Sequence, residues 1–491
     1  MYPFFPGNYV WNTATSMAIA MGAHLMEMDE AIRPLAEAGR RNDAAAQEEW
    51  FRAWGRLGER IEALAEADER AGNSLAAGRK HLRAAVYHMI AERMLPPFDT
   101  RRPDRYARML GCFRRGAARR GEPVEFVEVP YGAASLPALL VPGEGPGPWP
   151  VLLHLDGFDG MKEMLYLMGL PEELRRRGVA TLVLDHPGVG EAVRLRGLPV
   201  EPETERAAGA ALDWMGTRPE LRADRCGVLG ISLGGYYAPR AAAFDPRFRL
   251  CVAWGASWDY GRLTRERVHN LRPTERSVSH WTEHFRWVFG TATAEEALPV
   301  SARMTLEGII ERVTCPFLIV HGENDRQTSL SDARRVLDAA ANAGRLMETL
   351  RQIHFIPPAP FLWAERSGVF ARHGVVVEAV QTASSDEMGE ALRSGARDVG
   401  IGVMDNAVGW GEGVVVVAQL EARLPMRFMA APRIATLAEA AAEPIAVDAT
   451  TNGFVLVLYR ALARAGLRRG DCTFIELGGV RQRWEALAAG E

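Results

Sequence analysis

The chain has 491 residues, whereas single hydrophobic cores usually stop growing near about 250–300 residues, so two or three domains are expected. With 48% hydrophobic and 24% charged residues, its composition is that of an ordinary soluble globular protein. The formal net charge of -4 argues against a general nucleic-acid binder, because phosphate binding requires a concentrated basic surface.

The cysteines and the N-terminus indicate the compartment. The five cysteines are scattered along the chain without the spacing of metal ligands, which favours a reducing cytoplasm. The first basic residue is Arg33, so the charged start of a secretory signal is missing, and no window has the roughly 18 uninterrupted apolar residues of a membrane span. We expect a cytoplasmic protein that acts on a small molecule, without a metal, a cofactor, a membrane or a nucleic acid as partner.

Three zones follow one another along the chain. Residues 1–120 carry apolar stripes at helical spacing, which predict a helical domain with mostly buried aromatic side chains. The two stripes consist of Trp50, Phe51, Trp54, Leu57, Ile61 and Leu64, and of Leu82, Ala85, Val86, Met89 and Ile90. Residues 121–355 alternate short apolar runs with helical stretches, which is typical of a largely parallel sheet covered on both faces. Residues 356–491 again mix strands and helices and predict a third, α/β domain.

The strongest chemical signal is VLGISLGG at residues 228–235. A strand runs into Gly230-Ile231-Ser232-Leu233-Gly234, and a helix begins directly afterwards. In this strand–turn–helix setting, G-x-S-x-G predicts a tight turn that lifts the serine hydroxyl clear of the sheet. The helix N-terminus adds free N–H groups and the positive end of its dipole. Ser232 is therefore the predicted nucleophile.

A nucleophilic serine needs a base, and the base needs an orienting carboxylate. CPFLIVHGENDRQ at residues 315–327 supplies Asp325 just after a strand, with Glu323 as a nearby rival. METLRQI at residues 347–353 has the length and apolar content of a final hydrolase strand, and it delivers His354 as the predicted base. His373 is the only later histidine.

The oxyanion site is expected after an earlier strand, at VLLHLDGFDGMKE, residues 151–163. A backbone N–H near Phe158 and that of Leu233 are predicted to bind the developing negative charge. His154 and His186 precede the nucleophile in the chain, so both are expected to be structural or to line the pocket.

An insertion at about residues 258–314 contains several aromatic residues and is expected to form a cap. Trp258, Trp281 and His284 are candidates for the wall of a substrate pocket, although packing inside the cap is an equally good explanation for each of them.

Several separate motifs together resemble one family. They are WFRAWGRLGERIEALAEA, NSLAAGRKHLRAAVYHMIAERML, the KE after DGFDG, DHPGVGE, GISLGG and HGENDRQ. Residues 10–345 resemble the α/β-hydrolases with an N-terminal helical domain, a group that includes fungal polyketide-shortening hydrolases and is related to FrsA-like esterases. The resemblance implies hydrolysis of a C–C bond next to a ketone, a cap over the substrate, and frequent homodimers. It assigns the nucleophile to Ser232 and the acid to Asp325, whereas IHFIPPAP departs from the usual turn around the base.

Residues 347–491 resemble part of the solute-binding proteins of ABC importers for thiamine precursors, nitrate or sulfonates. The motifs are FIPPAPFLWAERSGVFARHGVVVEAV, DVGIGVMDNAVGW and IAVDATTNGFVLVLYRALARAGL. The resemblance implies that Asp405-Asn406 and the helix start at residues 450–452 face a ligand. It covers about half of such a protein, so a partial binding-protein fold without a closed cleft is expected.

The expected protein is thus a serine-triad hydrolase of the α/β-hydrolase fold, fused to this partial module. Cleavage of a C–C bond in a small ketone or diketone requires a carbon leaving group that departs as a stabilised enolate. The same triad also cleaves carboxylic esters. A third alternative is a non-enzymatic binding-like fusion that contains an inactive hydrolase.

Overall fold

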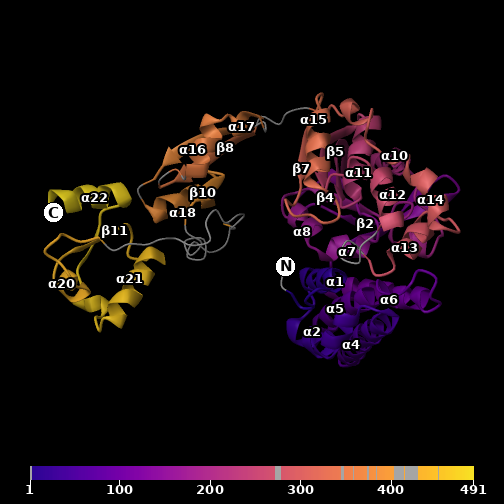
Figure 1. Cartoon of the computed structure of the whole chain (residues 1–491), viewed down its shortest axis with the longest axis horizontal. Coiled ribbons are helices and arrows are strands. Elements are labelled where there is room, and N and C mark those ends of the chain that lie inside the picture. The colour runs from indigo at the N-terminus through magenta and orange to yellow at the C-terminus, as the bar shows by residue number, and fades with distance from the viewer. Residues whose placement is uncertain are drawn as a thin grey trace. The chain divides into compact units, whose positions relative to one another are not determined.

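The computed structural model describes residues 3–270, 278–343, 348–355, 357, 359–372, 375–382, 384–402, 414, 429–451 and 453–490. The chain forms two compact units, Met1–Gly344 and Arg345–Glu491 (Figure 1). The division lies before the boundary after residue 355 that the sequence suggested. Within the described residues, no helix is both long and apolar enough to cross a membrane.

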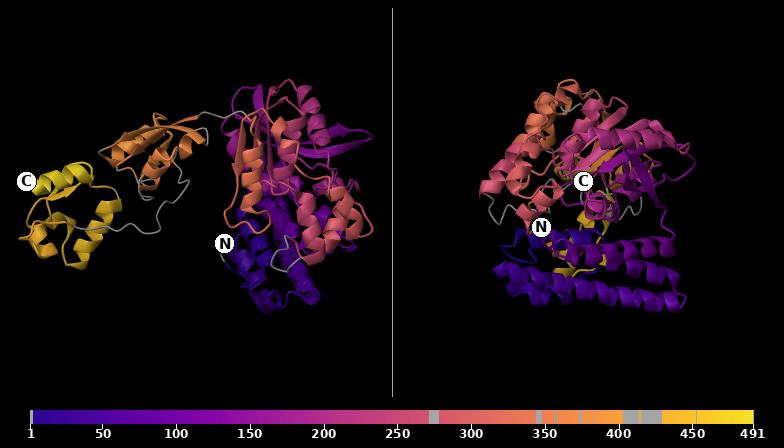
Figure 2. Two further views of the ribbon diagram at one scale, coloured as in Figure 1. Left: turned by 45° about the horizontal axis from the view of Figure 1, so that its top comes forward. Right: turned by 90° about the vertical axis from the view of Figure 1, so that its right-hand side faces the viewer.

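The first unit begins with a helical domain in which α5 packs between α4 and α6 (Figure 2). The side chain of Asp43 caps the N-terminus of α4, and Gly121 ends α6 in a left-handed conformation. The predicted stripe on α4 is buried except for Leu64, which is 48% exposed. The helices are α1 (Tyr9–Ala20), α2 (Leu25–Ile32), α3 (Ala36–Arg41), α4 (Ala44–Arg70), α5 (Ser74–Glu92) and α6 (Arg102–Arg120).

A seven-stranded sheet follows, in the order β1-β2-β4-β3-β5-β6-β7. Strand β2 is antiparallel to both of its neighbours, and β3 to β7 run parallel, as the predicted α/β-hydrolase fold requires. The strands are β1 (Glu125–Tyr131), β2 (Ala134–Val141), β3 (Trp149–Leu155), β4 (Ala180–Leu184), β5 (Leu221–Ile231), β6 (Phe248–Trp254) and β7 (Phe317–Val320). At the β7 edge, Leu318 and Val320 are largely exposed.

Helices cover the sheet and connect its strands. The main core lies between the sheet, α10, α11 and the cap, and a second core joins the helical domain to α7, β2 and β4. The connecting helices are α7 (Lys162–Leu167), α8 (Leu170–Arg175), α9 (Gly190–Arg194), α10 (Glu205–Gly216), α11 (Gly234–Phe244) and α15 (Leu330–Ala339). The cap between β6 and β7 contains α12 (Tyr260–Asn270), α13 (Trp281–Val288) and α14 (Ala294–Ser301).

The second unit contains two small parallel sheets, with the orders β10-β8-β9 and β11-β12. Its strands are β8 (Glu348–His354), β9 (Val375–Gln381), β10 (Val399–Ile401), β11 (Ile445–Val447) and β12 (Phe474–Glu476). Its helices are α16 (Ala359–Arg366), α17 (Val369–Arg372), α18 (Ser385–Arg393), α20 (Leu437–Ala441), α21 (Gly453–Arg464) and α22 (Val480–Ala489).

The expectation that residues 347–353 form the last strand of the hydrolase sheet is wrong. Strand β8 pairs along its whole length with β9 and, near its end, with β10. A strand can join any sheet edge that offers unpaired backbone groups. Here it pairs in parallel with β9, the strand that follows it in the sequence.

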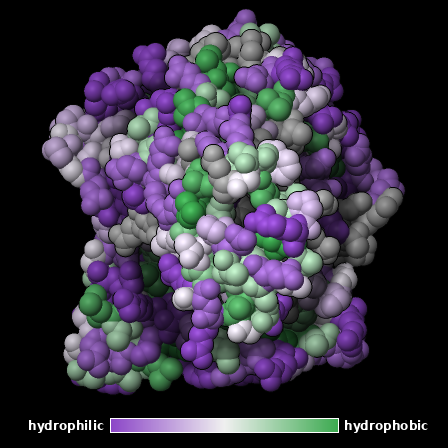
Figure 3. Space-filling view, turned by 90° about the vertical axis from the view of Figure 1, so that its left-hand side faces the viewer, coloured by the Kyte–Doolittle hydropathy of each residue, from purple (hydrophilic) through white to green (hydrophobic). Residues whose placement is uncertain are grey.

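Exposed hydrophobic residues are spread along the described part of the chain. Figure 3 shows one face, on which small hydrophobic areas lie between hydrophilic side chains. Single exposed residues such as Trp363 and Trp484 in the second unit fit this pattern, because apolar atoms make up much of any folded surface.

Candidate active site

Ser232 occupies a strained turn directly after β5. Its φ is +60°, in the left-handed region that residues with a side chain rarely adopt. The Ser232 N–H donates to the carbonyl of Trp254 (2.8 Å), and the Gly235 N–H donates to the carbonyl of Ser232 (2.7 Å). A Cβ at Gly230 would overlap the carbonyl of Gly234. The glycines of the motif are therefore sterically required, and the serine side chain is exposed, as predicted for a nucleophile.

The loop after β3 lies against this turn. A Cβ on Gly157 would be 2.9 Å from the amide nitrogen of Leu233 and 2.9 Å from Cβ of Ser232. Glycine at position 157 thus leaves room beside the Leu233 N–H, at the N-terminus of α11. When Ser232 attacks a carbonyl carbon, the carbonyl oxygen becomes negatively charged and needs this space. Phe158, the other predicted oxyanion residue, follows Gly157 in the same loop and is buried.

The carboxylate of buried Asp156 fixes the shape of this loop. It accepts hydrogen bonds from the N–H groups of Gly157 (2.7 Å) and Met161 (3.1 Å). Burial raises the pKa of Asp156 to about 7, and the neighbouring carboxyl groups of Asp159 and Asp185 act in the same direction. Asp156 is a structural element of the site that the sequence did not single out.

This raised pKa predicts a pH-dependent stability. Between about pH 4 and pH 7 the folded chain keeps a proton on Asp156 that the unfolded chain releases, so stability should fall as the pH rises, by up to about 4 kcal/mol. Urea unfolding of wild type and Asp156→Asn at several pH values measures the effect. The difference between the two curves should grow from pH 4 to pH 7 and stay constant above, and a difference independent of pH would contradict the assignment.

His154 and His186 are both buried, in agreement with a structural role. The Nε2 atom of His186 lies 3.2 Å from the carbonyl oxygen of Asp156, and its ring contacts Tyr237. Burial lowers the pKa of His154 to about 3. His186 therefore supports the loop that carries Gly157 and Phe158.

A buried ion cluster joins this loop to the loop after β4. The Nζ atom of Lys162 lies 2.8 Å from Glu163, 3.1 Å from Asp185 and 2.9 Å from Glu191. The carboxylate of Asp185 also accepts from the backbone N–H groups of Lys162 and Glu191, each at 2.7 Å. Burial alone would lower the pKa of Lys162, but Asp185 and Glu163 hold it well above its ordinary value. These residues are the KE and DHPGVGE motifs, whose role the sequence did not reveal.

Asp325, the predicted acid, lies in the loop after β7 and is exposed. Its Oδ1 atom accepts from the N–H groups of Gln327 (2.7 Å) and Thr328 (3.2 Å). The ring of His321 supports the same loop, with Nε2 3.0 Å from the Thr328 carbonyl, and Arg267 from the cap donates to the carbonyl of Gln327 (2.9 Å). The rival Glu323 is exposed as well.

The cap is bonded to the oxyanion loop. The Nε2 atom of His284 lies 3.2 Å from the Phe158 carbonyl, and the two rings make an edge contact at 4.8 Å. Burial lowers the pKa of His284 to about 3, so the ring is neutral and donates through Nε2. Trp281 stacks on Phe285 at 5.1 Å. Two of the three predicted pocket residues thus lie next to the residue predicted to bind the oxyanion.

Trp258 has a different environment. It is buried under the guanidinium of Arg335 (4.3 Å) and contributes to a surface hollow of about 580 Å³ along α15. Ser232 does not line this hollow. Packing between the cap and α15 accounts for this tryptophan.

His354 lies at the end of β8 in the second unit and is buried, with Phe361 against its ring (5.7 Å). The side-chain amide of Gln352 donates to its Nδ1 atom (3.0 Å). Burial lowers the pKa of His354, so the imidazole is neutral near pH 7, as a general base must be. His373 lies outside the described residues.

The residues predicted to face a ligand in the second unit are only partly described. Asp405, Asn406 and Asn452 lie outside the described residues. Thr450 is described, and its backbone N–H and its hydroxyl both donate to Glu476, at 2.7 and 2.8 Å.

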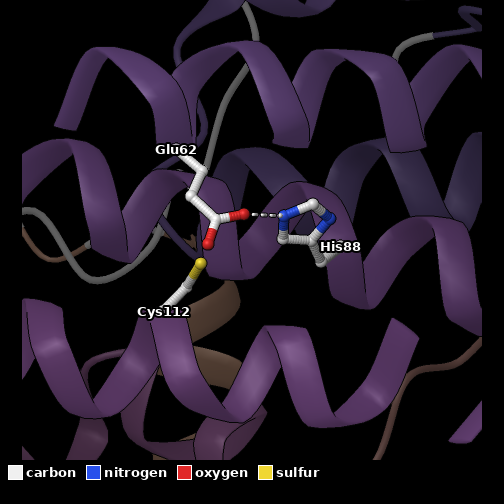
Figure 4. Close-up of side chains that lie close together, drawn as sticks. All are labelled: Glu62, His88 and Cys112. Atoms are coloured by element: carbon white, nitrogen blue, oxygen red, sulfur yellow. Dashed lines mark hydrogen bonds and ion pairs between the residues drawn. The ribbon is translucent and has the colours of Figure 1, made fainter. Parts of the chain in front are cut away.

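Glu62, His88 and Cys112 form the one group of the described residues with ligand atoms close enough for a metal ion (Figure 4). Arg108 and Arg115 donate to Glu62 (2.6 Å each), and the bonds from His88 and Arg108 keep the pKa of the Glu62 carboxyl low despite burial. Arg105 donates to Nδ1 of His88 and thereby places the ring proton on Nε2, facing Glu62. Burial raises the pKa of the Cys112 thiol to about 12. The surrounding guanidinium groups repel a cation, so the cluster joins α4, α5 and α6 instead.

Comparisons with known proteins agree with this fold. A family model described as the prolyl oligopeptidase family matches residues 208–353. The chain is 31% identical over 290 residues to 2,6-dihydropseudooxynicotine hydrolase of Paenarthrobacter nicotinovorans, covering 59% of this chain and 74% of that protein. It is 31% identical over 319 residues to 20-hydroxy-prefusarin hydrolase of Gibberella moniliformis, covering 58% of this chain and 75% of that protein.

A solved structure has the same architecture. The crystal structure of the 2,6-dihydroxy-pseudo-oxynicotine hydrolase matches with a TM-score of 0.55 and 28% identity, covering 67% of this chain and 87% of that chain. Its match and those of the two curated relatives include most of the length of each of these enzymes. The chain therefore belongs to the α/β-hydrolase family, a family of enzymes that catalyse hydrolysis.

Proposed function

We propose that Ser232 is the nucleophile of a hydrolase that cleaves a C–C bond in a small ketone or diketone through an acyl-enzyme. The observation that carries the proposal is the strained turn at Ser232 with Gly157 against the Leu233 amide. Together they give an exposed hydroxyl, a helix N-terminus and space for an oxyanion at one point of the sheet edge.

The reaction has two steps. Ser232 Oγ attacks the carbonyl carbon while the base takes its proton, and the N–H groups of Leu233 and Phe158 bind the oxyanion. The C–C bond then breaks, and the carbon leaving group departs as an enolate that receives the proton from the base. Water hydrolyses the acyl-enzyme in the same way. Asp325 is the proposed acid that orients the base.

The choice of substrate rests on the relatives. The names of both relatives identify them as hydrolases of particular small molecules, and C–C cleavage is the activity that the family resemblance implies. Carboxylic ester hydrolysis is the second candidate, because the same turn and oxyanion site stabilise the tetrahedral intermediate of an ester.

His354 is the proposed base, on the evidence of chain order. It follows Ser232 and Asp325, and the matched family segment, residues 208–353, ends one residue before it. The location of β8 in a separate sheet removes the argument from strand position. The hydrolysis rate of His354→Ala tests this assignment.

Labelling with a fluorophosphonate tests the nucleophile directly. Because the probe reacts with activated serines whatever their substrate, wild type should be labelled at Ser232, and Ser232→Ala should not be labelled at all. Mass spectrometry of the labelled peptide identifies the site, and circular dichroism shows whether the variant is folded. Equal labelling of a folded Ser232→Ala variant would remove this residue from the mechanism.

For the second unit we propose a partial binding-protein-like module without a ligand of its own. Its support is the sequence resemblance and the alternation of parallel strands with helices. A cytoplasmic location and a homodimeric state remain predictions from the sequence.

A further inference from the structure

Two buried side chains of the cap have a hydrogen-bond donor without a partner. Tyr260 at the start of α12 is 4% exposed, and Trp281 at the start of α13 is 1% exposed. Neither the Tyr260 hydroxyl nor the Trp281 indole N–H has a hydrogen-bond partner within the described part of the chain. Leaving such a group unpaired costs free energy, so each one calls for an explanation.

Both side chains surround the same residue of the oxyanion loop. The ring of Phe158 lies 6.4 Å from the ring of Tyr260 and 6.0 Å from that of Trp281. His284 also contacts this ring, but it uses its donor on the Phe158 carbonyl. The side chains with unpaired donors thus lie around Phe158, the residue whose N–H is proposed to bind the oxyanion.

Two other buried tyrosines of this unit have hydrogen-bond partners, whereas the hydroxyl of buried Tyr106 in α6 has none within the described residues. The Tyr236 hydroxyl donates to the carbonyl of Pro202 (3.0 Å) and accepts from Arg240 (3.3 Å). The hydroxyl of Tyr87 donates to Glu27 (2.6 Å). An unpaired hydroxyl alone does not mark a ligand site, and what distinguishes Tyr260 is its ring contact with Phe158 of the oxyanion loop.

We infer that Tyr260 and Trp281 determine substrate specificity by donating hydrogen bonds to oxygen atoms of the substrate other than the scissile carbonyl. The inference rests on the proposed function, because it places the substrate beside Phe158. An indole N–H donates only and a tyrosine hydroxyl can donate as well, so the matching ligand atoms are hydrogen-bond acceptors. A second ketone or a hydroxyl close to the scissile carbonyl satisfies this requirement, whereas a simple alkyl chain does not.

A binding experiment without turnover tests the inference. In the Ser232→Ala background, the Kd of 1-phenylbutane-1,3-dione is measured by calorimetry and compared with that of butyrophenone, which lacks the second carbonyl. Adding Tyr260→Phe should weaken binding of the dione about five- to tenfold, the usual effect of one neutral hydrogen bond, and change butyrophenone binding less than twofold. Trp281→Phe should have a similar selective effect.

The stability of the variants separates recognition from folding. Tyr260→Phe removes a hydroxyl that has no partner, so the Tm of the ligand-free protein should be unchanged or higher. Tyr236→Phe is the matched control: it breaks two hydrogen bonds, so it should lower the Tm and leave the Kd of the dione unchanged.

Two results would overturn the inference. One is an unchanged dione Kd in Tyr260→Phe and Trp281→Phe, and the other is no measurable binding of the dione by Ser232→Ala. If the proposed function itself is wrong, Ser232 of the wild-type protein will not be labelled by the fluorophosphonate, which is a separate result.

Discussion

Lys162→Met is expected to destabilise the first unit by about 3–5 kcal/mol at pH 7.5, the usual cost of removing one partner from a buried ionic group. The ammonium group lies against Glu163, Asp185 and Glu191, and its side chain is only 2% exposed. Methionine fills a similar volume but leaves the carboxylates without their cation. Urea unfolding followed by tryptophan fluorescence measures the loss.

Lys80, the other lysine of the chain, provides the matched control. It pairs with Asp68 in the helical domain, where the two side chains are 28% and 20% exposed, so Lys80→Met should cost about 1 kcal/mol or less. The cost of Lys162→Met should also shrink as the pH falls, because burial raises the pKa of Glu163 and a protonated carboxyl group no longer needs the cation. Equal costs for both variants, or no change with pH, would contradict an electrostatic role of the cluster.

The parts of the site that depend on local sequence could be predicted. The turn at Ser232 requires glycine at Gly230 and a helix directly after it, and both requirements are visible in eight consecutive residues. The loop of Asp325 was also located correctly, after β7, and its carboxylate bonds to the next residues of that loop, whereas its role as the acid stays a prediction.

Contacts between distant segments could not be predicted in the same way. Lys162, Asp185 and Glu191 meet because β3 and β4 are neighbours in the sheet, which only the tertiary structure establishes. The cap aromatics show a related limit. Trp258 packs under Arg335, whereas the indole N–H of Trp281 has no partner within the described residues. The sequence pattern does not distinguish these two environments.

The strand at β8 shows why strand type is easier to predict than strand partner. Its length and pattern were predicted correctly, but the pattern cannot tell which edge a strand joins. Both the β7 edge and β9 offer unpaired backbone groups, and β8 pairs with β9. The exposed Leu318 and Val320 on β7 are the structural consequence within the first unit.

His354→Ala is expected to lower kcat/KM for a p-nitrophenyl ester and for a 1,3-diketone by about 10²-fold or more, similar to Ser232→Ala, because members of a triad act as a unit. Two observations support this expectation. Burial keeps the His354 imidazole neutral at pH 7, and the hydrolase family match extends to residue 353. His373→Ala is the control and should retain the wild-type rate.

The bond from Gln352 makes the test sharper. With its amide N–H on Nδ1 of His354, the ring proton lies on Nε2, which then cannot accept a proton from serine. A base that accepts through Nε2 needs an acceptor at Nδ1, which is the role proposed for Asp325, so the amide of Gln352 must leave Nδ1 when the triad forms. Gln352→Leu removes this competing bond, so it should leave kcat unchanged or raise it if His354 is the base. If His354→Ala keeps the full wild-type rate while Ser232→Ala is inactive, another group takes the proton. His321 would then be the next residue to replace, because its buried Nδ1 atom has no partner in the described residues and it follows β7 at the sheet edge of Asp325.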